Sequence, residues 1–138
     1  MENIKNEEAV ITNLLDRYEA FKLKWLQINE QDMFDFLKLQ DEIDDKVIEL
    51  KSQYLEEDLT FKRDYGIKLN EIKSQKDFEG KKMFTDTMAK WICDAEFFER
   101  ELDLIVMKCT YENLANKSKK IVEYINVVKL ALRKDFSI

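Results

Sequence analysis

Lysine side chains gather in two stretches of the sequence and are the clearest candidates for a chemical task. Their cationic groups bind phosphate by charge, so both stretches are candidate nucleic-acid-binding surfaces. The predicted binding residues are Lys68, Lys73, Lys76, Lys81 and Lys82 in the first stretch, and Lys117, Lys119, Lys120, Lys129, Arg133 and Lys134 in the second. Two aromatic residues near the first stretch, Tyr65 and Phe78, are candidate platforms on which bases stack.

The second basic stretch has an alternative explanation within the chain. Residues 32–58 are strongly acidic and include four carboxylates at 41–45. If the chain folds into an antiparallel hairpin, these carboxylates lie opposite residues 111–121 and pair with the lysines there. The sequence leaves two possibilities open: a basic stretch that is paired within the chain, and one that is free to bind phosphate.

The residue types that most often carry catalysis or bind metal are scarce. The chain has no histidine, which removes the commonest general base, and the carboxylates at 41–45 lack the glycine and the spacing of an EF-hand loop. Cys109 falls in an apolar stripe and is predicted to be buried, whereas Cys93 falls outside it and is predicted to be more exposed. We therefore expect no enzymatic activity, no cofactor, no metal site and no small-molecule substrate.

Composition predicts that long helices position these residues. The 138 residues include no proline and two glycines, whereas turns and sheets depend on both residue types. Charged residues make up 38% of the chain and hydrophobic ones 45%, a mixture too apolar for a disordered chain. Because the sequence contains neither a membrane-spanning apolar run nor a signal peptide, we expect a cytoplasmic protein with no membrane partner.

The apolar pattern predicts three helices, at about residues 7–28, 33–72 and 84–134, with a loop at about 74–82. In the first helix the apolar residues alternate steps of three and four, as in the heptad repeat of a coiled coil. These residues are Ile11, Leu14, Tyr18, Phe21, Trp25 and Ile28. We expect a single all-α domain over residues 1–138: an elongated antiparallel hairpin with a third, N-terminal helix and coiled-coil-like packing.

Polar residues and a glycine mark the expected helix ends. Asn29 or Asp32 is the expected N-cap of the second helix, and Thr85 is the expected N-cap of the third. Gly66 lies inside the second helical pattern, where glycine costs about 1 kcal/mol relative to alanine. It therefore marks either a kink or an early end of that helix.

The third predicted helix carries two apolar stripes. The first consists of Phe84, Met88, Trp91, Ala95, Phe98, Leu102, Ile105 and Cys109, and the second of Leu104, Met107, Tyr111, Leu114, Ser118, Ile121, Ile125, Val128 and Leu132. Where the stripes overlap, apolar residues cover most of the helix circumference, which predicts burial on more than one side. Either the first helix covers the second side, or that side is the interface of a homo-oligomer. The predicted interface residues are Leu102, Leu104, Ile105, Val106, Met107, Cys109 and Tyr111.

In outline the sequence resembles the UvsY recombination-mediator family of tailed phages. The matching residues after the predicted loop are Lys81, Lys82, Phe84, Asp86 and Asp94, and those near the C-terminus are Lys117, Lys119, Lys120, Ile121, Ile125 and Arg133. The region of Trp25 and the segment Arg63-Asp64-Tyr65-Gly66 resemble the part before the loop. The resemblance implies a homo-oligomer that binds single-stranded DNA and helps to load a recombinase onto strands covered by single-strand-binding protein.

Two functions therefore stand as hypotheses. The first is a non-enzymatic, oligomeric accessory protein of phage-type DNA recombination or replication, which binds single-stranded DNA, the recombinase or single-strand-binding protein in the host cell cytoplasm. The alternative is a coiled-coil structural or protein-interaction module that binds no nucleic acid. The net charge of −6 disfavours a simple polyanion binder, because it repels a phosphate backbone at long range.

Overall fold

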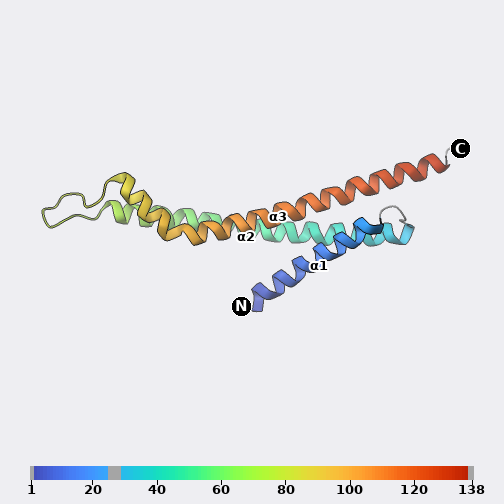
Figure 1. Ribbon diagram of the computed structural model, residues 1–138, viewed down its shortest axis with the longest axis horizontal. Helices are drawn as coiled ribbons and strands as arrows, with labels where there is room; N and C mark the ends of the chain where they lie inside the picture. The colour runs from blue at the N-terminus through green and yellow to red at the C-terminus, as the bar shows by residue number, and fades with distance from the viewer. Residues whose placement is uncertain (1, 25–28, 137–138) are drawn as a thin grey trace. The chain divides into compact units, whose positions relative to one another are not determined.

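The computed structural model describes residues 2–24 and 29–136, without the side chains of 2–5, 30 and 131–136. The described residues form three helices: α1 (Glu2–Lys24), α2 (Glu30–Lys73) and α3 (Asp86–Phe136) (Figure 1). This confirms the all-α class and the helical hairpin predicted from the sequence. Two of the predicted heptad residues, Trp25 and Ile28, lie outside the described residues.

Side chains cap the N-termini of α2 and α3 as the sequence predicts. At the start of α2, the backbone N–H of Asp32 donates to Oδ1 of Asn29 (2.8 Å), and the N–H of Asn29 donates to Oδ2 of Asp32 (3.2 Å). This reciprocal pair satisfies two backbone groups that a helix N-terminus leaves without partners. At the start of α3, Oγ1 of Thr85 accepts from the N–H of Met88 at 3.2 Å. Gly66 does not end α2, which continues to Lys73.

The chain divides into two compact units, and the long helices α2 and α3 contribute to both. We call the described residues up to Glu49 together with those from Thr110 onward the three-helix unit, and residues Leu50–Cys109 the hairpin unit. The prediction that the whole chain forms a single domain stays a prediction.

In the three-helix unit, α1 packs against the first part of α2 and the last part of α3. Phe21 is 1% exposed, and its ring meets those of Phe36 and Tyr124 edge to face, with centroids 4.1 and 5.5 Å apart. The other buried apolar residues of this unit include Leu14, Tyr18, Leu39, Ile43, Leu114, Ile121 and Ile125. The heptad pattern of α1 therefore correctly located the core face of that helix at the residues that the structure describes.

In the hairpin unit, the second part of α2 packs against the first part of α3. Its buried cluster consists of Ile72, Ala89, Cys93 and Phe97, against which Phe61, Tyr65, Leu69 and Phe84 pack. The ring of Phe97 lies edge to face with Phe61 and Tyr65, each with centroids 5.7 Å apart. Small residues at positions 89 and 93 let α2 and α3 approach closely, while the aromatic rings fill the space beside them.

The prediction for the two cysteines was wrong. Cys93 is fully buried in the hairpin unit, and Cys109 is exposed. The first predicted stripe of α3 is also largely in solvent: Met88 is 45% exposed, Trp91 67%, Phe98 57%, Leu102 44% and Ile105 51%. The sequence pattern selected the larger apolar side chains, whereas α3 turns its smaller ones, Ala89 and Cys93, toward α2.

Candidate nucleic-acid interface

The loop that joins α2 to α3 in the hairpin unit has a hydrogen-bonded backbone. The N–H of Met83 donates to the carbonyl of Gln75 at 3.0 Å, and the N–H of Asp77 donates to the carbonyl of Lys81 at 2.8 Å. Gly80 has a φ of +76°, in the left-handed region that favours glycine. These contacts define a tight hairpin loop, which we call the tip (residues 74–85).

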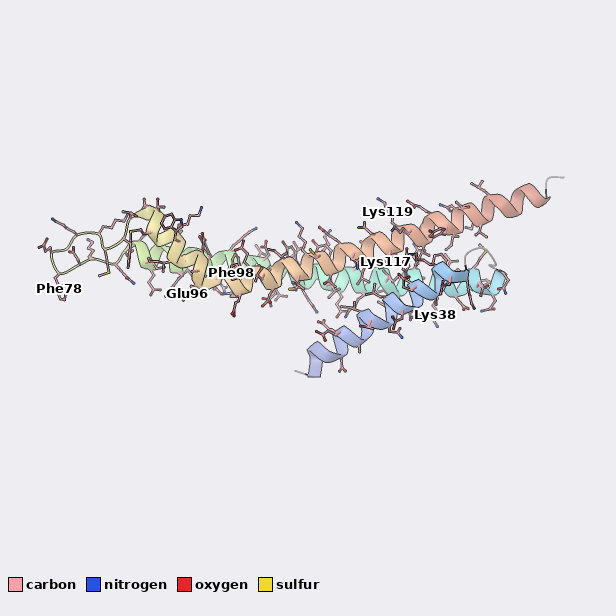
Figure 2. The ribbon with its side chains drawn as sticks, viewed as in Figure 1. Lys38, Phe78, Glu96, Phe98, Lys117 and Lys119 are labelled. Atoms are coloured by element: carbon pink, nitrogen blue, oxygen red, sulfur yellow. The ribbon has the colours of Figure 1, made fainter. Side chains whose placement is uncertain are left out.

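The carboxylate of Asp77 holds the turn at the end of the tip. Its Oδ1 accepts hydrogen bonds from the N–H groups of Glu79 and Lys81, both at 2.9 Å, as aspartate often does in turns. Phe78 lies at the apex of this turn and is fully exposed (Figure 2). The turn thus presents a phenyl ring in water with its faces accessible.

Four of the predicted lysines surround this ring in sequence: Lys73, Lys76, Lys81 and Lys82. Residues 73–82 contain these four cations and two acidic residues, Asp77 and Glu79, so the segment carries a net charge of +2. Lys76 and Lys82 form an antiparallel backbone bridge, which places these two residues side by side across the loop.

Two of the tip lysines, Lys81 and Lys82, already have ion-pair partners, but those pairs are exposed. Lys81 lies 3.6 Å from Glu79, and Lys82 pairs with Asp86. Hydrogen bonding from Lys82 and the charge of Lys73 lower the pKa of Asp86 below its usual value. Since an exposed ion pair is screened by water and contributes little, a phosphate can compete for these cations.

Lys68 and Tyr65 are less available than the sequence suggested. The ammonium of Lys68 lies 3.7 Å from both Glu71 and Glu96. Tyr65 is half-buried in the core cluster, and its hydroxyl donates to Oδ1 of Asp94 at 2.5 Å. This hydrogen bond raises the pKa of Tyr65 to about 12. Tyr65 therefore serves the packing of the hairpin unit, and Phe78 is the aromatic residue that the tip offers to a base.

The second basic stretch lies in the three-helix unit. Lys117 is half-buried, with its ammonium 4.7 Å from the centroid of the Tyr18 ring, a cation–π contact. Lys119, Lys120 and Lys129 are exposed, and no ion pair among the described residues involves them. The side chains of Arg133 and Lys134 lie outside the described residues.

The acidic cluster of α2 has other partners in this unit. Asp44 accepts a hydrogen bond from the hydroxyl of Ser118, and Glu42 pairs with Arg17 of α1. The predicted pairing of this cluster with the basic stretch is thus absent among the described side chains. The sequence pattern placed Ser118 in an apolar stripe and did not indicate Arg17, because neither residue belongs to a charge run.

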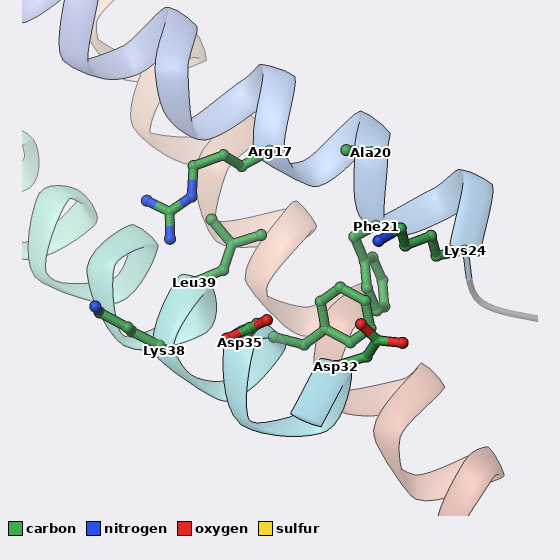
Figure 3. A pocket seen from close by; sticks show the side chains of 9 residues that line it. Arg17, Ala20, Phe21, Lys24, Asp32, Asp35, Lys38 and Leu39 are labelled. Carbon is green, nitrogen blue, oxygen red and sulfur yellow. The ribbon is translucent and has the colours of Figure 1, made fainter. Parts of the chain in front are cut away.

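A hollow of about 340 Å³ in the three-helix unit lies between α1 and α2 (Figure 3). Its lining mixes both signs of charge, with Arg17, Lys24 and Lys38 beside Asp32 and Asp35. Such a mixture does not select one ligand charge. Among the described residues, no group of three or more histidine, cysteine, aspartate or glutamate side chains could hold a metal ion.

The residues predicted to form the oligomer interface lie in different environments in the structure. Leu104 is buried within the chain, and Met107 and Tyr111 are partly buried. Exposed positions among them are Leu102, Ile105, Val106 and Cys109. Only this second group is therefore placed to meet a molecule from outside.

Comparisons with known proteins found no matching family model, no matching curated protein and no matching solved structure. No helix among the described residues is both long and apolar enough to cross a membrane.

Proposed function

We propose that this protein is a non-enzymatic, oligomeric accessory protein of phage-type DNA recombination or replication, and that its tip binds single-stranded DNA. The observation that carries the proposal is Phe78, which lies fully exposed at the apex of a hydrogen-bonded turn among four lysines. The outline shared with the UvsY family supports recombination as the setting, with the recombinase and single-strand-binding protein as partners.

The tip suits a single strand because it combines the two contacts that such a strand offers. An unpaired base stacks on an aromatic ring, which contributes about 1–3 kcal/mol per base, and the neighbouring phosphates attract the lysines. A duplex hides its base faces, so Phe78 would have nothing to stack on there. The ring and the cations together therefore select single-stranded nucleic acid.

The proposal also sets the strength of binding. A net charge of −6 disfavours DNA binding over much of the surface, and the segment 73–82, with a net charge of +2, neutralises few phosphates. Binding by one tip is then weak, and it depends on salt because each neutralised phosphate releases counterions. Oligomerisation raises the overall affinity by joining several weak contacts in one particle.

The test measures fluorescence anisotropy of a labelled oligothymidylate with the full chain at low and at physiological salt. Phe78→Ala and the double variant Lys76→Ala/Lys81→Ala should each weaken binding. Matched controls should not: Phe34→Ala removes an aromatic ring that is 69% exposed on α2, and Lys38→Ala/Lys51→Ala removes two exposed cations from the same helix. Absence of binding at low salt, or equal losses in tip and control variants, would refute the proposal.

One observation favours the second candidate, a protein-interaction module without nucleic-acid binding. The apolar residues of α3 that face solvent, Trp91 and Phe98 among them, are typical of a helix that docks on another protein. The same titration distinguishes the two candidate functions. A protein-interaction module shows no salt-dependent affinity for the oligonucleotide, although it self-associates or binds another protein.

A further inference from the structure

The hairpin unit leaves one apolar face of α3 without a neighbour. We call this face the α3 stripe: Met88, Trp91, Ala95, Phe98, Leu102, Ile105 and Cys109. Its members follow one another by alternating steps of three and four residues. Met88, Trp91, Phe98, Leu102 and Ile105 are between 44% and 67% exposed, and Phe98 is labelled in Figure 2. The stripe spans three heptads, or about 32 Å of helix at 1.5 Å per residue.

The α3 stripe lies on the side of the helix opposite to α2. In heptad terms its residues occupy the a and d positions, while Cys93, Phe97 and Leu104, which are buried within the chain, occupy c and f. Because f is diametrically opposite to the a/d seam, packing on α2 cannot cover the stripe. The hairpin unit thus has a complete core on one side of α3 and a coiled-coil seam on the other.

We propose that the α3 stripe binds the same stripe of a second copy of this chain, with the two α3 helices antiparallel. A strict repeat of 3.5 residues is the pattern that one helix presents to another helix along a seam. At 67% and 57% exposure, Trp91 and Phe98 leave on the order of 250 Å² of aromatic surface per subunit in water, if each ring can bury 150–250 Å². The five smaller residues of the stripe add to this area, and a stable protein–protein interface buries roughly 800 Å² per partner.

Side-chain volumes favour the antiparallel orientation. With the two helices centred near Arg100, Ala95 lies opposite Ile105 of the partner subunit, and Trp91 lies opposite Cys109 of the partner subunit. Both of these layers then combine a small residue with a larger one, as close packing requires. In a parallel pair, Trp91 would meet its own equivalent and Ala95 would meet its own, so one layer would be overfilled and the other would be empty.

Charges beside the seam favour the same orientation. In the antiparallel pair, Asp94 lies next to Lys108 of the partner subunit, and symmetry repeats this contact. One oxygen of Asp94 accepts from Tyr65, which leaves its second oxygen for that lysine. A parallel pair would instead bring Asp94 next to Glu99 of the partner subunit. In the antiparallel pair, Glu99 and Glu101 each approach their own equivalents near the centre, and this repulsion opposes the attraction of the outer contacts.

The first experiment measures the mass of the full chain over a range of concentrations by sedimentation equilibrium. Phe98→Glu and Trp91→Glu should raise the dimer dissociation constant by at least about tenfold, because each puts a charge into the apolar seam. The matched control is Leu59→Glu: Leu59 is 70% exposed on α2 of the same unit and lies off the stripe. A monomeric wild type, a wild-type mass that the stripe variants leave unchanged, or an equal effect of Leu59→Glu would overturn the proposal.

The second experiment uses the native Cys109, which is exposed while Cys93 is buried. A spin label on Cys109 should give an intersubunit separation of about 27 Å between helix positions, since an antiparallel pair places Cys109 about 18 residues from its equivalent along the axis. Mild oxidation should then form no disulfide between subunits. A short distance together with ready disulfide formation would show a parallel pair and overturn the orientation. Neither experiment contains DNA, so the proposed dimer interface and the proposed DNA binding by the tip fail separately.

Discussion

Two adjacent phenylalanines of α3, Phe97 and Phe98, provide a sharp test of how the hairpin unit is packed. Phe97 is 8% exposed, its ring contacts those of Phe61 and Tyr65, and the guanidinium of Arg100 lies 5.3 Å from its centroid. Phe98 is 57% exposed. The substitution Phe97→Ala removes a buried ring, whereas Phe98→Ala removes one that mostly faces solvent, although the two residues are chemically identical neighbours.

The expected magnitudes follow from burial. Truncating a buried phenylalanine to alanine costs about 3–5 kcal/mol, and the two ring contacts place Phe97→Ala in the upper part of that range. Phe98→Ala should lower the free energy of unfolding by less than about 1 kcal/mol in the monomer, since more than half of the side chain is already hydrated. The difference between the two variants should therefore be at least about 2 kcal/mol.

The assay is urea unfolding followed by far-UV circular dichroism, at a protein concentration well below that of association and again well above it. At the low concentration, Phe97→Ala should shift the unfolding midpoint strongly and Phe98→Ala only slightly. At the high concentration, the Phe98→Ala deficit should grow, because the wild type is then also stabilised by its partner. If Phe98→Ala is as destabilising as Phe97→Ala in the monomer, α3 is rotated about its axis relative to this structure and the α3 stripe does not exist.

Two further predictions concern the same unit. Replacing Tyr65 by phenylalanine should remove the hydrogen bond to Asp94 and lower the free energy of unfolding by about 1 kcal/mol. Because the folded-state pKa of Tyr65, about 12, lies above its ordinary value of 10.0, this contribution is complete below pH 10 and is lost as the pH rises from 10 to 12. Between pH 10 and 12, the free energy of unfolding should fall less steeply with pH in Tyr65→Phe than in the wild type. An unchanged slope would contradict the assignment. For the cysteines, a thiol reagent should modify Cys109 rapidly in the native monomer, at a protein concentration well below that of association, and Cys93 only after the hairpin unit opens, since burial also raises the pKa of the Cys93 thiol. Mass mapping that finds Cys93 modified first would contradict the structure.

Much of the helical architecture was predictable because it depends on local signals. The lack of proline permits long helices, and the pairs at Asn29 and Asp32 and at Thr85 and Met88 are short-range hydrogen bonds that a sequence pattern can indicate. The core face of α1 was also predictable, since the sequence of that helix shows a single apolar stripe. The loop at 74–82 was predictable because that segment is polar and contains a glycine, and in the structure Gly80 and Asp77 supply its turn.

The orientation of α3 was not predictable, because two apolar faces compete and hydrophobicity alone favours the larger side chains. The face that α2 contacts contains Ala89 and Cys93, which contribute little hydrophobicity but let the helices approach closely. It also contains Arg100, whose charge suggests a solvated position. In the structure the guanidinium lies over the rings of Phe61 and Phe97 and pairs with Asp64 at 3.1 Å. A charged residue on the edge of a core face is visible only once the partner helix is in place.

The two proposals together restrict how the protein could handle a DNA strand. The tip and the α3 stripe belong to the same hairpin unit, so an antiparallel pairing centred near Arg100 places the two tips at opposite ends of the paired helices. The first residue of α3, Asp86, lies about 14 residues from that centre, which separates the two tips by at least about 42 Å. A short oligonucleotide can then reach only one tip, and its affinity is that of a single Phe78 with its lysines. Affinity rises above that of a single tip only when the strand is long enough to span both tips. A shorter strand that is bound to one tip has no effective concentration at the other, because it cannot reach it. The dimer would thus bind extended single strands more tightly than short ones, and this selectivity arises from the spacing of two weak sites and from no further contact with the bases.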